Sequence, residues 1–120
     1  MFLLAFHFNG CAMSSLQLAT NPQLKDFQRY VRDLEIERGF SEQDAIEKCL
    51  LLGEEMGELF KAVRKHQAMG IDQNSKIGSI KEELADIFIY ICAIANRFNI
   101  DLESAFLEKE AFNKTRVWRS

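Results

Sequence analysis

Two pairs of carboxylates stand inside apolar helical sequence, and they constrain this chain more than any other feature. Glu55 and Glu58 follow a run of leucines, and Glu83 and Asp86 precede the apolar segment 87–95. Each pair has i,i+3 spacing, so both of its acids project from one face of a helix. An unpartnered carboxylate on an apolar face is costly and would normally be neutralised. Four converging acids therefore predict a hard divalent metal held by oxygen ligands.

The composition predicts an all-α fold. The chain has 120 residues, enough for one domain, with 48% hydrophobic residues and a single proline, Pro22. Start and stop signals, including Asn21-Pro22, Gly39 and Asp101, divide the sequence into four helices and one loop. We expect helices at about 21–38, 41–66, 79–98 and 101–117, with a loop at 67–78.

The third expected helix is apolar on nearly every side between residues 87 and 95. A helix of this kind is buried all round. Three further helices of this length hardly surround it, so a partner subunit is the expected cover. We therefore predict a four-helix bundle-type domain that is completed by dimerisation.

The first 20 residues differ from the rest. The segment 1–6 is apolar but short and lacks a basic start, so we expect no secretory signal. We predict that residues 1–20 form a poorly ordered N-terminal tail and that residues 21–120 form the domain. We also expect no membrane span, because the apolar run 84–95 is short and contains Asp86.

The net charge and the cysteine content indicate which partners to expect and which cellular compartment the protein occupies. The net charge is −3, whereas a nucleic-acid-binding domain normally carries a basic patch, so no nucleic-acid partner is expected. Cys11, Cys49 and Cys92 are widely separated and form no CxxC motif. Cys49 and Cys92 lie in apolar helical runs and indicate buried thiols in a reducing cytoplasm.

A second constellation lies on the fourth expected helix. Lys109, Asn113 and Arg116 follow i, i+4, i+7 spacing and extend its apolar stripe. Donors in this position can reach an anion held nearby. A polar helix end whose basic residues complement the helix dipole explains them equally well, so both interpretations stay open at this point.

These blocks together resemble the MazG-like nucleoside triphosphate pyrophosphohydrolases, an all-α family. Its pattern is EExxE, a variable spacer and then ExxD. Here Glu54-Glu55-Met56-Gly57-Glu58 is followed, after residues 59–82, by Glu83-Leu84-Ala85-Asp86, and the stretch 108–116 is similar to the family's lysine-asparagine-arginine ending. The resemblance covers about residues 24–118. Either acidic block alone would be weak evidence for the family, but the two blocks and the ending together make the resemblance specific.

The resemblance implies an enzyme that hydrolyses (deoxy)nucleoside triphosphates to a nucleoside monophosphate and pyrophosphate, in nucleotide-pool housekeeping. It implies Mg²⁺, for which Mn²⁺ can substitute, and a homodimer or a homotetramer built from two dimers. The implied metal ligands are Glu55, Glu58, Glu83 and Asp86. Glu54, Glu55 and Glu58 are the implied catalytic acids, with Glu54 orienting water. The implied substrate-binding residues are Lys109, Asn113, Arg116 and, at the pocket wall, Tyr90.

Two other classes of helical protein are alternatives to this interpretation. Di-iron carboxylate bundles use Glu-x-x-His pairs on two helices, and no such pair exists here, since Val63 stands three residues before His66. A non-catalytic helical metal-binding or interaction module on the same fold stays possible. The sequence does not identify the base that is bound: Phe27, Tyr30, Phe40 and Trp118 are all candidates for stacking on it.

Overall fold

The computed structural model describes residues 14–119, and within them the chain is helical with no strand. Four α-helices follow one another: α1 (Leu24–Arg38), α2 (Ala45–His66), α3 (Ile80–Arg97) and α4 (Leu102–Asn113). The all-α prediction with four helices is confirmed.

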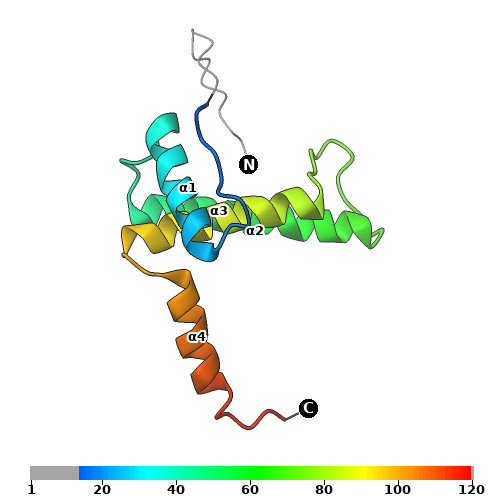
Figure 1. Cartoon of the computed structure of the whole chain (residues 1–120). Helices are drawn as coiled ribbons and strands as arrows, with labels where there is room; N and C mark the ends of the chain where they lie inside the picture. Colours follow the sequence, from blue (N-terminus) through cyan, green and yellow to red (C-terminus); the bar gives the residue numbers. More distant parts are fainter. Residues whose placement is uncertain (1–13, 120) are drawn as a thin grey trace.

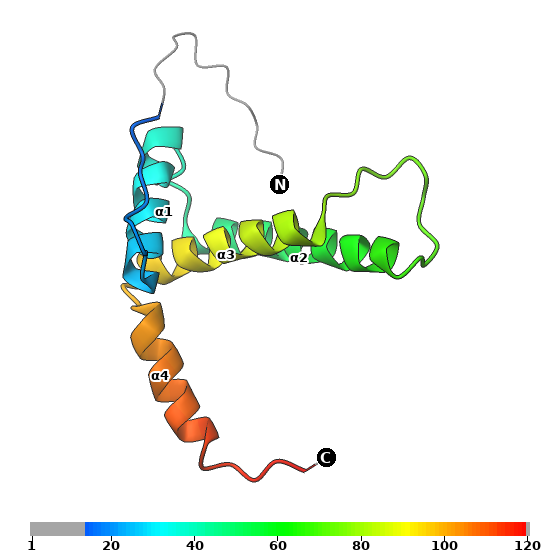
Figure 2. The same cartoon turned by 45° about the vertical axis from the view of Figure 1, so that its right-hand side comes forward.

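The long helices α2 and α3 form an antiparallel hairpin that is closed by the loop between them (Figure 1). Helix α1 packs across the end of this hairpin that lies away from the loop, where it contacts α3 (Figure 2). The core forms at this crossing, from Val31 and Leu34 of α1 and Cys92 and Ala93 of α3. The hairpin thus extends beyond the core (Figure 1), and Glu55, Glu83 and Asp86 lie on this extension.

Local capping explains where the helices begin. Asp44, Ser79 and Asp101 each accept a hydrogen bond from the backbone N–H three residues later, at the starts of α2, α3 and α4. Gly39 ends α1 in the left-handed conformation (φ 77°), as a glycine at that position readily does. The expected cap at Asn21 is wrong: α1 begins at Leu24 with Gln23 as its N-cap.

Helix α4 differs from the expectation in length and in packing. It ends at Asn113 instead of near Val117, so Arg116 lies beyond the helix. It contacts α1 and projects away from the α2–α3 hairpin (Figures 1 and 2). No residue of α4 is buried, so tertiary contacts do not hold its last turns in place.

A single chain does not close the bundle. The Cα radius of gyration is 17.3 Å, against about 14 Å for a compact domain of this length. Large apolar side chains stand exposed on α2, where Leu50 is 69% exposed, and on α3, at Leu84 and Ile91. Within residues 14–119, part of the apolar surface of α3 is therefore left uncovered.

The N-terminal segment, the cysteines and the expected absence of a membrane span can be compared with the structure as far as it describes them. Leu16, within the predicted tail, packs against the core, and residues 1–13 of that tail, with Cys11, lie outside the described residues. Cys92 is buried, and burial raises the pKa of its thiol to about 11. Cys49 is exposed, so its predicted burial is wrong for the single chain. Among residues 14–119, no helix is both long enough and apolar enough to cross a bilayer.

Candidate metal and nucleotide site

Three of the predicted acids meet between α2 and α3. Glu55 on α2 and Glu83 and Asp86 on α3 each offer a carboxylate oxygen, and these oxygens lie within 4.8 Å of one another. Glu55 is 5% exposed and Glu83 is 4% exposed. The three carboxylates thus meet at one point of the hairpin, with Glu55 and Glu83 buried and Asp86 half-buried. Their convergence agrees with the i,i+3 spacing on α3 and with the apolar stripe of α2.

The surroundings of this three-acid cluster fit a cation. Among the described residues, the buried Oε2 atom of Glu83 has no hydrogen-bond partner, which is costly for a carboxylate oxygen. Burial raises the pKa of Glu55, and the neighbouring Glu83 and Asp86 raise it further. A divalent metal would remove both penalties, and an all-oxygen donor set is the kind that Mg²⁺ and Mn²⁺ prefer.

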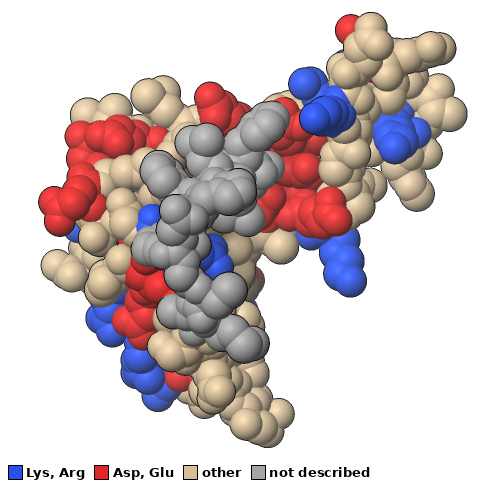
Figure 3. Space-filling model, turned by 90° about the horizontal axis from the view of Figure 1, so that it is seen from above, with Lys and Arg blue, Asp and Glu red and all other residues tan. Residues whose placement is uncertain are grey.

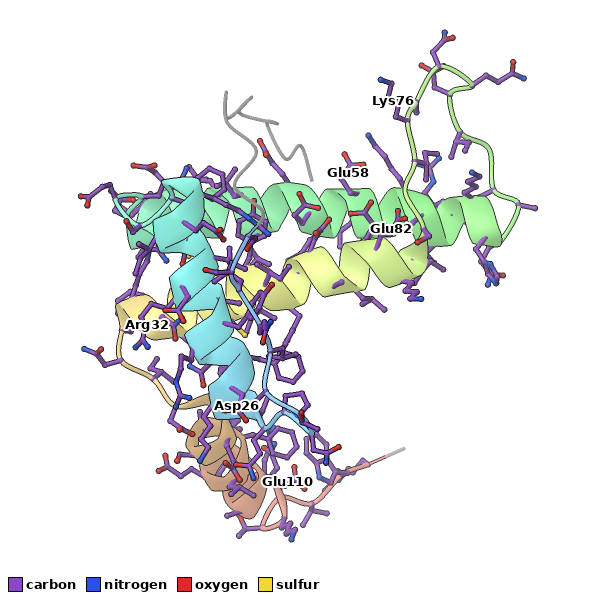
Figure 4. All side chains as sticks on the ribbon, turned by 45° about the horizontal axis from the view of Figure 1, so that its top comes forward. Asp26, Arg32, Glu58, Lys76, Glu82 and Glu110 are labelled. Atoms are coloured by element: carbon purple, nitrogen blue, oxygen red, sulfur yellow. The ribbon has the colours of Figure 1, made fainter. Side chains whose placement is uncertain are left out.

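Glu58 and Glu54 lie at the edge of the cluster and not within it. Glu58 does not belong to the three-acid group; its Oε1 lies 3.8 Å from Nζ of Lys61, in a partly exposed ion pair. Glu54 is exposed. Glu58 on α2 and Glu82 on α3 mark the two sides of this part of the hairpin (Figure 4). Seen from above, acidic side chains gather over the hairpin beside the loop (Figure 3).

Tyr90 lies beside the cluster, one helical turn beyond Asp86. Burial raises the pKa of its hydroxyl, and the charges of Glu55 and Asp86 are the next causes. Nζ of Lys48 lies 5.5 Å from the centre of its ring. The phenol therefore has acidic neighbours in the cluster and a basic neighbour in Lys48, which forms a buried ion pair.

That ion pair is a feature that the sequence analysis missed. Glu35 of α1 accepts hydrogen bonds of 2.9 and 2.7 Å from Arg97 of α3, and Nζ of Lys48 of α2 lies 3.0 Å from its carboxylate. Burial alone would raise the pKa of Glu35, but the two cations outweigh it and hold the pKa below its usual value. The signal was available: Glu35 lies four residues after Val31, on the apolar stripe of its helix.

The predicted phosphate-binding residues are not brought to the cluster within one chain. Lys109 lies over the ring of Phe112, with its Nζ 5.0 Å from the centre, and Arg116 lies over Trp118. Glu110 marks the position of α4, which is well separated from Glu58 and Glu82 (Figure 4). Asn113 keeps a buried Oδ1 with no hydrogen-bond partner in the described part of the chain.

The four aromatic candidates for base stacking differ in environment. Phe27 packs edge-on against Phe88, with ring centres 5.5 Å apart, and Tyr30 also packs on the core. Phe40 lies under the ammonium of Lys48. Trp118 is largely exposed. The rings of Phe27 and Tyr30 thus already pack against the protein core.

Comparisons with known proteins agree on the family. The MazG nucleotide pyrophosphohydrolase domain matches residues 36–116. The chain is 29% identical over 116 residues to dCTP pyrophosphatase 1 of Rattus norvegicus; the match covers 90% of this chain and 66% of that protein, a little under two thirds of its length. Two crystal structures of iMazG from Vibrio DAT 722, C-terminally and N-terminally tagged, are 31% identical with TM-scores of 0.58. They cover 78% and 81% of this chain, and the match spans 99% of each of them. The chain belongs to the MazG family of nucleotide pyrophosphohydrolases.

Proposed function

We propose that this protein hydrolyses (deoxy)nucleoside triphosphates between the α- and β-phosphates, in a reaction that depends on Mg²⁺. The products are a nucleoside monophosphate and pyrophosphate. One observation carries the proposal: three carboxylates on two helices converge within 4.8 Å in a chain of this family. The match to a dCTP pyrophosphatase supports a deoxynucleotide substrate. Its setting would be nucleotide-pool housekeeping in the cytoplasm.

Glu55, Glu83 and Asp86 would hold the metal, with Glu58 as a further ligand from the next turn of α2. Mg²⁺ bound there would neutralise phosphate charge and lower the pKa of water, and Mn²⁺ would substitute for it. The buried, unpartnered Oε2 of Glu83 supports this assignment. Glu58 would have to leave its exposed pair with Lys61, which costs little, since such pairs contribute about 0–1 kcal/mol.

The neighbouring side chains would position the reactants. Glu54 is exposed beside the cluster, where its carboxylate would orient the attacking water and accept its proton. Tyr90 would form the pocket wall beside the phosphates or sugar. Its raised pKa keeps the phenol protonated at neutral pH, so its hydroxyl would be available as a hydrogen-bond donor.

The phosphate-binding residues would come from a second copy of the chain. Lys109, Asn113 and Arg116 lie on or just after α4, which projects away from its own cluster (Figure 2). In a homodimer, or in a tetramer of two dimers, α4 of one copy could reach the acids of the other. The uncovered apolar surfaces of α2 and α3 support such an assembly.

A panel of the eight common nucleoside triphosphates tests the proposal. Each is incubated with the protein and Mg²⁺, and both pyrophosphate and orthophosphate are measured. We expect pyrophosphate from at least one deoxynucleotide and no reaction in EDTA. Orthophosphate and a diphosphate as the main products would contradict the proposal.

A further inference from the structure

Gly78 lies against the carboxylate of Glu83. A Cβ atom built on Gly78 would stand 2.3 Å from Oε1 of Glu83 and 3.3 Å from its Cδ. Real Cβ atoms do not approach a heavy atom so closely. Any L-residue other than glycine at position 78 would therefore displace this carboxylate.

The backbone does not explain a glycine at this position. Among the described glycines only Gly39 has a positive φ, so the conformation of Gly78 is open to any residue. Gly53, Gly57 and Gly70 have open space where a Cβ would stand. Gly78 thus differs from these other glycines, because the Glu83 carboxylate occupies the space where its side chain would stand.

The start of α3 fixes this geometry. Ser79 caps the helix and forms a reciprocal pair of hydrogen bonds with Glu82, of 3.1 and 3.2 Å. The backbone N–H of Glu83 also bonds to the carbonyl of Ser79, at 3.1 Å. The capping box therefore holds Gly78 and the base of the Glu83 side chain in one arrangement, in which Glu83 is 96% buried and reaches Glu55 and Asp86.

We propose that Gly78 is a positioning residue for the metal site: its lack of a side chain lets the Glu83 carboxylate lie where it meets Glu55 and Asp86. The inference rests on the proposed function, because it assigns that cluster to a divalent metal. A methyl group at position 78 would push the tip of the Glu83 side chain and press more lightly on Oε2 of Glu82, at 3.2 Å, and it would meet no backbone atom. The change should therefore weaken metal binding much more than it weakens the fold.

Binding of Mn²⁺ alone, followed by electron paramagnetic resonance of the free ion, tests the proposal without nucleotide. We expect Gly78→Ala to raise the Kd for Mn²⁺ about 10-fold to 100-fold, as loss of a ligand-orienting group does. Gly70→Ala, in the same loop and facing open space, is the matched control and should bind as the wild type does. Melting in EDTA should change little in either variant.

The Glu83→Gln background separates positioning from general damage. If Gly78 acts through the Glu83 carboxylate, Gly78→Ala should change the Kd less than about twofold once that carboxylate is gone, since the two effects are coupled. Equal losses in both backgrounds, or a Gly78→Ala variant that is unfolded in EDTA, would overturn the role of Gly78. Unchanged Mn²⁺ binding by Gly78→Ala would overturn it while leaving the proposed function intact. A wild type that binds no Mn²⁺ would instead refute the proposed metal site and this inference with it.

Discussion

At the scale of single residues, the cluster between α2 and α3 distinguishes the acids that we propose as metal ligands from acids that only face solvent. Glu55→Gln or Asp86→Asn removes ligand charge, so we expect kcat to fall about 100-fold or more, because even outer-shell changes at metal sites cost 10-fold to 100-fold. Steady-state pyrophosphate release measures this, with circular dichroism to show that the helices persist. Glu42→Gln, at an exposed acid before α2, is the control. Equal losses in all three variants would mean that the cluster is not the site.

The buried charges around Glu35 predict a stability effect that is independent of catalysis. Glu35→Gln leaves Lys48 and Arg97 without their shared carboxylate, and breaking a buried ion pair costs about 3–5 kcal/mol. Urea denaturation at pH 7 measures the loss of unfolding free energy. Lys48 is 3% exposed, so water does not replace the lost partner. A change below about 1 kcal/mol would show that the cluster is not held in this arrangement.

The same carboxylate gives a pH dependence with a definite sign. The pKa of Glu35 is held below its ordinary value of 4.5. A lowered folded-state pKa stabilises the fold fully above the ordinary value, and this stability is lost as the pH falls through the lowered pKa. Wild type should therefore lose more unfolding free energy than Glu35→Gln between about pH 5 and pH 3. Parallel pH profiles for the two proteins would contradict this.

Some of these residues could be predicted from the sequence and others could not, for a physical reason. Glu55, Glu83 and Asp86 could be predicted because helical spacing and an apolar stripe are local patterns. The partnership of Glu35, Lys48 and Arg97 joins three helices, and the contact between Gly78 and Glu83 depends on side-chain geometry. Neither can be derived from spacing along one helix. Cys49 was misjudged because its apolar neighbours include Leu50, which is exposed in the single chain.

At the scale of the helices, capping residues predicted most of the boundaries and the core did not have to be known. The start of α1, expected at Asn21, and the C-terminal end of α4 are exceptions. The expected stripe of α4 through Arg116 required a helix that continues to about residue 117, but no residue of α4 is buried among the described residues and the helix stops at Asn113. The orientation of α4 away from the hairpin likewise has no local signal, because it depends on contacts with α1.

Helix α4 carries its own prediction. Lys109→Ala and Asn113→Ala should each raise KM more than they lower kcat, as expected for contacts with ground-state phosphate. Steady-state kinetics on the preferred triphosphate measures this. Lys25→Ala, an exposed lysine on α1, is the matched control for the loss of one positive charge. If neither α4 variant differs from the control, these residues only form a polar helix end.

At the scale of the whole molecule, the exposed apolar surface predicts association. Leu50, Phe60 and Leu84 are among the large apolar side chains left exposed on the hairpin, and a stable monomer rarely keeps such a surface. Sedimentation velocity at micromolar concentration should show a dimer or a tetramer. A compact, stable monomer would contradict this and would also remove the partner copy that we propose for the phosphate-binding residues.

The central claim is that a carboxylate-bound divalent metal directs hydrolysis to the bond between the α- and β-phosphates. The most direct test follows one reaction with the preferred triphosphate by ³¹P nuclear magnetic resonance, with Mg²⁺ and then with EDTA. We predict that the three triphosphate signals are replaced by those of a monophosphate and pyrophosphate with Mg²⁺, and that they persist in EDTA or with Glu55→Gln. Signals of a diphosphate and orthophosphate, or an unchanged reaction in EDTA, would contradict the account.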